Sequence, residues 1–74
     1  MPRFYFHVRR GQTTVIDREG MELANETEAA LEAARRGREI ATADALKGIR
    51  PGGGLIIVDD EGDNSVVEIP LEGS

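Results

Sequence analysis

The chain has 74 residues, a formal net charge of −5 and no cysteine. A chain of this length forms one domain, here residues 1–74, and buries only about 60–65% of its unfolded surface, so its stability is marginal. The acidic balance argues against a general nucleic-acid or anionic-membrane binder, and the absence of cysteine excludes disulfides and thiolate metal sites.

The first predicted element is a strand over residues 3–9. Apolar and polar side chains alternate there with a period of two, which is typical of a strand with one buried face. The two phenylalanines of the chain, Phe4 and Phe6, share the predicted buried face with Val8. The opposite face carries the polar set Arg3, Tyr5, His7 and Arg9.

A second strand is predicted over residues 13–17, because its first four residues are all β-branched. The short turn between the two strands predicts a β-hairpin. Asp17 and Gly20 then occupy the first and fourth positions of a type I turn. Residues 21–23 are expected to form a short strand that leads into the helix.

One amphipathic helix is predicted over residues 26–47. Asn25 is a suitable N-cap residue, and Gly48 suits the left-handed position that follows the last turn. At 100° per residue, small side chains gather on one side and charged ones on the other. We expect Phe4 and Phe6 to fill the space under this small-residue side, which consists of Ala30, Ala33, Ala34, Gly37, Ile40, Ala41 and Ala45.

Two further strands are predicted after a glycine-rich connector at residues 51–54. The strand over 55–59 begins with four apolar residues, which indicates burial on both faces. The strand over 65–70 alternates again, and Pro70 indicates that this end lies at a sheet edge or finishes the strand, because proline has no N–H to donate. The predicted fold is therefore α+β, in the order ββαββ, with one long helix on one face of a small antiparallel sheet. The order of the strands within the sheet is left open.

The first half of the chain resembles a known family. The resemblance rests on residues 1–9 (MPRFYFHVR), on Gly11, on residues 17–23 (DREGMEL) and on the Ala-rich helix that follows. These features look like those of a family of short bacterial proteins, frequent in alphaproteobacteria, that is classed as a domain of unknown function. The resemblance implies a bacterial, cytoplasmic setting and assigns no activity, cofactor or catalytic residue.

The residues that could carry chemistry do not converge on a catalytic, metal or cofactor site. His7 is the single histidine, and a general-base role would need Asp17 or Glu19 to hold it. A histidine on a solvated strand face is the better interpretation. The acidic run at residues 59–63 fails as an EF-hand loop, because Asn64 and Pro70 stand where glycine and glutamate are required. We therefore expect a protein that is not an enzyme and holds no metal or cofactor.

The binding surface predicted from the sequence is the face that carries Arg3, Tyr5, His7 and Arg9. We expect a cytoplasmic interaction module that acts as a homodimer, because residues 55–58 put apolar side chains on a face that one helix cannot cover. The chain's own connector or tail is the competing cover. The alternative function is a nucleic-acid-associated regulator, similar to a small antitoxin, since basic and aromatic side chains on a sheet can hold single-stranded RNA. No segment is apolar enough to serve as a signal peptide or a membrane span.

Overall fold

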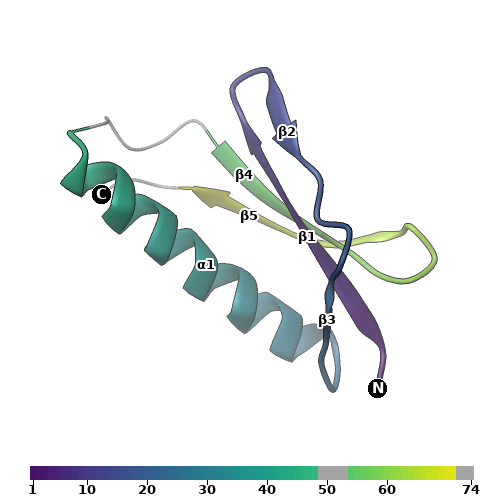
Figure 1. The fold of residues 1–74 in the computed structure, drawn as a ribbon. Coiled ribbons are helices and arrows are strands. Elements are labelled where there is room, and N and C mark those ends of the chain that lie inside the picture. Colours follow the sequence, from purple (N-terminus) through teal and green to yellow (C-terminus); the bar gives the residue numbers. More distant parts are fainter. Residues whose placement is uncertain (49–53, 72–74) are drawn as a thin grey trace.

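The computed structural model describes residues 1–48 and 54–71. Its elements are β1 (Arg3–Arg10), β2 (Thr13–Val15), β3 (Met21–Glu22), α1 (Glu26–Leu46), β4 (Gly54–Asp59) and β5 (Ser65–Leu71). The helix packs against a five-stranded antiparallel sheet, so the predicted α+β fold is confirmed (Figure 1). The predicted connector up to residue 53 and the predicted tail, 72–74, lie outside the described residues.

The sheet is built around β1, which pairs with three other strands. The order is β2-β1-β4-β5, and β3 pairs with the first two residues of β1. β2 and β3 therefore lie along one edge of β1, separated by the loop 16–20, while β4 occupies the other edge (Figure 1). Pro70 lies in β5, an edge strand, where its missing N–H costs no ladder hydrogen bond.

The bounds of α1 follow from its caps. The Asn25 side chain accepts a hydrogen bond from the backbone N–H of Glu28 at 2.9 Å, as the sequence predicts. Lys47 is the C-cap residue, and Gly48 adopts a positive φ of 77° directly after it. A residue with a β-carbon would be strained in that conformation, which is why glycine ends the helix there. No helix within residues 1–48 and 54–71 is long and apolar enough to cross a membrane.

The core lies between α1 and the face of the sheet below it. Phe4 and Phe6 are each only 3% exposed and belong to one buried cluster with Ala29 and Ala33 of α1, so they lie beneath the helix as predicted. The space next to Gly37, which was predicted to be filled by them, is instead occupied by Leu71 and Ile56. The guanidinium group of Arg36 stacks over the Phe6 ring, 4.3 Å from its centroid. The helix runs mainly along β5 and β4 (Figure 1). The buried cluster consists of Phe4, Phe6, Ala29, Ala33, Ile56, Val58 and Leu71.

The helix is rotated about its axis relative to the predicted small-residue side. Ala33 is buried as predicted, but Ala45 is exposed, and Ala29 and Asp44 are buried in addition. The rotation brings the carboxylate of Asp44 to the guanidinium group of Arg10, at the end of β1, and the two form an ion pair. A stripe of alanines constrains the rotation of a helix only weakly, because alanine is tolerated both in the core and at the surface.

Candidate interaction surface

The face of the sheet that points away from α1 is called the open face below. Alternation along β1 places Phe4 and Phe6 in the core, with Val8 packed against it, and places the odd-numbered residues on the open face. The register then aligns Tyr5 with Asp59, His7 with Ile57 and Arg9 with Leu55. From β5, Glu68 lies beside Ile57 and Pro70 lies beside Leu55. The open face therefore has an apolar centre on β4, with charged side chains around it.

Arg3 is the first residue of β1, and both its side chain and its backbone are bonded within the chain. Its side chain donates to the backbone carbonyl of Glu19 at 2.6 Å and lies 4.0 Å from the carboxylate of Glu22. Its backbone N–H donates to Oε1 of Glu61, in the turn between β4 and β5, at 2.8 Å. The guanidinium group therefore bonds one backbone carbonyl and lies near one carboxylate, and the side chain is 40% exposed.

His7 is enclosed by two hydrogen bonds, so it is less solvated than the sequence suggests. Its side chain is 14% exposed. The backbone N–H of Asp17 donates to Nδ1 at 3.1 Å, and Nε2 lies 3.2 Å from Oδ2 of Asp59. Since Nδ1 accepts, the neutral ring carries its proton on Nε2 and donates it to Asp59. Both ring nitrogens are occupied, so the imidazole has no free lone pair with which to take a proton from a substrate.

The carboxylate of Asp17 closes the edge of β1 between β2 and β3. It accepts backbone N–H groups from Phe6 at 3.0 Å, from Glu19 at 3.1 Å and from Gly20 at 3.1 Å. Burial, the largest single influence, raises the pKa of Asp17. The three N–H donors and the positive charge of Arg36 together outweigh burial, so the pKa lies below its usual value. This side chain replaces the missing strand partner of Phe6.

We expect the two bonds of His7 to contribute separately to stability. Asparagine can still accept at the position of Nδ1, and glutamine can still donate at the position of Nε2, so each variant keeps one bond. His7→Asn and His7→Gln should each lower the free energy of unfolding by about 0.5–1.5 kcal/mol, and His7→Ala by about 1–3 kcal/mol. Urea unfolding monitored by circular dichroism measures these differences. A His7→Ala variant with the wild-type midpoint would show that neither bond contributes.

The four predicted binding residues thus have different environments. Arg3 and His7 are bonded within the chain, and Tyr5 is half-buried beside Asp59. Arg9 is exposed and forms no ion pair with any residue in 1–48 or 54–71. The sequence pattern did not indicate that Asp59 and Glu68 lie on this face. The sequence contains two relevant features, the alternation of β5 and the position of Asp59 at the end of an apolar strand. Neither feature predicts which strand lies next to β1.

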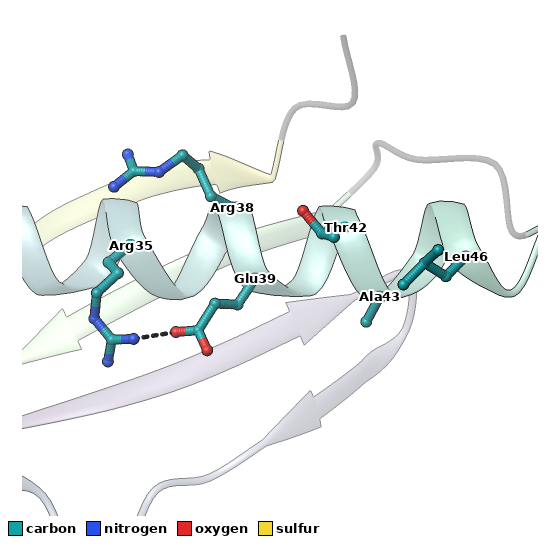
Figure 2. Close-up of a pocket in the computed structure, with 6 residues that line it drawn as sticks. All are labelled: Arg35, Arg38, Glu39, Thr42, Ala43 and Leu46. Atoms are coloured by element: carbon teal, nitrogen blue, oxygen red, sulfur yellow. Dashed lines mark hydrogen bonds and ion pairs between the residues drawn. The ribbon is translucent and has the colours of Figure 1, made fainter.

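A second surface lies on the outer side of α1, where a shallow pocket is lined by six residues (Figure 2). Arg35 reaches Glu39 across it and also binds Glu32, which bonds Arg36 as well. The pKa of Glu32 is lowered to about 2, chiefly by hydrogen bonds from Arg35. Partial burial raises the pKa, but Arg36 lowers it further. These bonds join neighbouring turns of one helix, so this is a charged, solvated helix face. The lining residues are Arg35, Arg38, Glu39, Thr42, Ala43 and Leu46.

One comparison with known proteins gives a match. A family model described as a domain of unknown function (DUF6894) matches residues 3–72, which is nearly the whole chain. No curated protein and no solved structure matches the chain.

Proposed function

The chain belongs to DUF6894, a family described as a domain of unknown function, and we propose a function for it from its structure. We propose that it is a non-enzymatic interaction module that acts as a homodimer. One observation carries the proposal: α1 packs on one face of the sheet, and no other helix or strand within residues 1–48 and 54–71 packs on the opposite face. Tyr5, Leu55 and Ile57 lie on that open face. An apolar centre with charged surroundings is the usual composition of a protein–protein interface.

A small chain without disulfides also gains stability from self-association, because binding to the folded state shifts the unfolding equilibrium.

The homodimer is better supported than the nucleic-acid-associated regulator. Single-stranded RNA needs basic side chains that are free to meet phosphates. On the open face, Arg3 and His7 already bond acidic or backbone groups, and Asp59 and Glu68 add negative charge beside them. The resemblance of residues 1–9 and 17–23 to a bacterial family supports the further proposal that the module works in a bacterial cytoplasm.

We expect Ile57→Asp to separate the dimer into folded monomers. The substitution puts a charge at the apolar centre of the open face and leaves the buried cluster unchanged. Leu31→Asp is the matched control, because Leu31 lies on α1 and is 61% exposed. Sedimentation equilibrium at tens of micromolar should give the mass of two chains for the wild type and the control, and of one chain for Ile57→Asp.

A wild-type mass of one chain at every concentration would refute the homodimer. Cover by the chain's own connector or tail, the competing prediction from the sequence, would then be the alternative to test. Binding of single-stranded RNA that weakens steeply with salt, and is lost in Arg9→Ala, would instead favour the regulator.

A further inference from the structure

Arg9 and Glu68 are the two charged side chains of the open face that form no ion pair within residues 1–48 and 54–71. We propose that they select a second copy of this chain, Arg9 binding the partner's Glu68 and Glu68 binding the partner's Arg9. This inference rests on the proposed homodimer and adds the contact that specifies the partner. Both residues are exposed, so neither is needed for the core.

The register places the two charges on opposite sides of the apolar centre. Arg9 lies on β1 beside Leu55, and Glu68 lies on β5 beside Ile57. Two strand spacings therefore separate their backbones, about 10 Å, and they are offset along the strands by two residues, about 7 Å. β4, with Leu55 and Ile57, runs between them.

Two-fold symmetry turns this arrangement into a complementary one. In a two-fold interface, the same patch contacts itself, so a group on one side of the centre meets the group from the other side of the partner. Leu55 and Ile57 would pack in the middle, and two identical ion pairs would form at the rim. Rim ion pairs add little affinity, but they exclude partners that present a like charge. The proposed role of Arg9 and Glu68 is therefore specificity for self.

Charge reversal tests the pairing directly. Arg9→Glu places two negative charges at each rim contact, and Glu68→Arg places two positive ones. We expect each variant to dimerise at least tenfold more weakly than the wild type, which corresponds to about 1.4 kcal/mol. An equimolar mixture of the two variants restores opposite charges at both contacts, and it should form dimers that contain one chain of each kind.

Native mass spectrometry distinguishes the two variants by mass, and sedimentation equilibrium gives the dissociation constants. Arg38→Glu is the matched control, because Arg38 is exposed on the outer side of α1. It should leave the dimer unchanged. The neutral variants Arg9→Gln and Glu68→Gln should fall between the wild type and the reversed variants, and far-ultraviolet circular dichroism checks that every variant is folded.

The outcomes separate the pairing from the proposed function. If the wild type dimerises and the reversed variants dimerise equally well, the proposed pairing is wrong and the homodimer forms through other contacts. Reversed variants that are both weakened but fail to combine when mixed would also overturn the pairing. A wild type that stays monomeric refutes the homodimer, and the pairing with it.

Discussion

Phe6→Ala is expected to lower the free energy of unfolding by about 3–5 kcal/mol, which is a large part of the total for a domain of this size. Phe6 is 3% exposed and belongs to the buried cluster beneath α1. The substitution removes the whole ring and leaves a cavity between helix and sheet that the backbone cannot fully close. It also removes the surface on which the Arg36 guanidinium stacks, 4.3 Å from the ring centroid.

Chemical denaturation at a fixed protein concentration measures the change, because the proposed self-association would make the apparent stability depend on concentration. Leu31→Ala is the control. It deletes an apolar side chain that is 61% exposed, so it should change the free energy of unfolding by less than about 0.5 kcal/mol. If Phe6→Ala unfolds at the same denaturant concentration as Leu31→Ala, the position of this residue in the core is wrong.

Asp17→Ala is expected to cost about 2–4 kcal/mol, the second largest effect. The substitution removes the acceptor of three backbone N–H groups, those of Phe6, Glu19 and Gly20. The N–H of Phe6 is partly buried, and the loop 16–20 would have to rearrange before water could reach it. Asp17→Asn keeps one side-chain oxygen and should cost about half as much, since neutral acceptors bind more weakly than charged ones.

The contribution of Asp17 should depend on pH with a defined sign. Its pKa in the folded protein lies below 3.8, the value taken for the unfolded chain. The charged carboxylate therefore stabilises the fold above that pH, and the stabilisation is lost as the pH falls through the folded pKa. The difference in unfolding free energy between wild type and Asp17→Asn should be constant near pH 7 and should shrink below about pH 4. A difference that stays constant down to pH 2 would show that the charge of Asp17 contributes nothing.

The local structure could be predicted from the sequence, since each local feature is encoded by residues close together in the chain. Alternation along residues 3–9 placed Phe4 and Phe6 in the core, because successive side chains of a strand point to opposite faces. Asn25 and Gly48 marked the ends of the helix, because capping depends on side-chain and backbone conformations within one turn. The single helix on an antiparallel sheet followed from the order of these elements.

The chemical character of the open face could not be predicted, because it depends on which strands the fold places side by side. In the sequence, the first ten residues are basic and the last third is acidic, which suggested a basic face around Tyr5. The pairing of β4 with β1 instead places Asp59 against His7, and β5 adds Glu68 in the same row. About fifty residues separate these partners, and no local pattern specifies which strand will lie beside β1 or in which register. The rotation of α1 about its axis also depends on the tertiary structure, because a row of alanines fits more than one orientation. In the orientation that the helix adopts, Asp44 pairs with the distant Arg10.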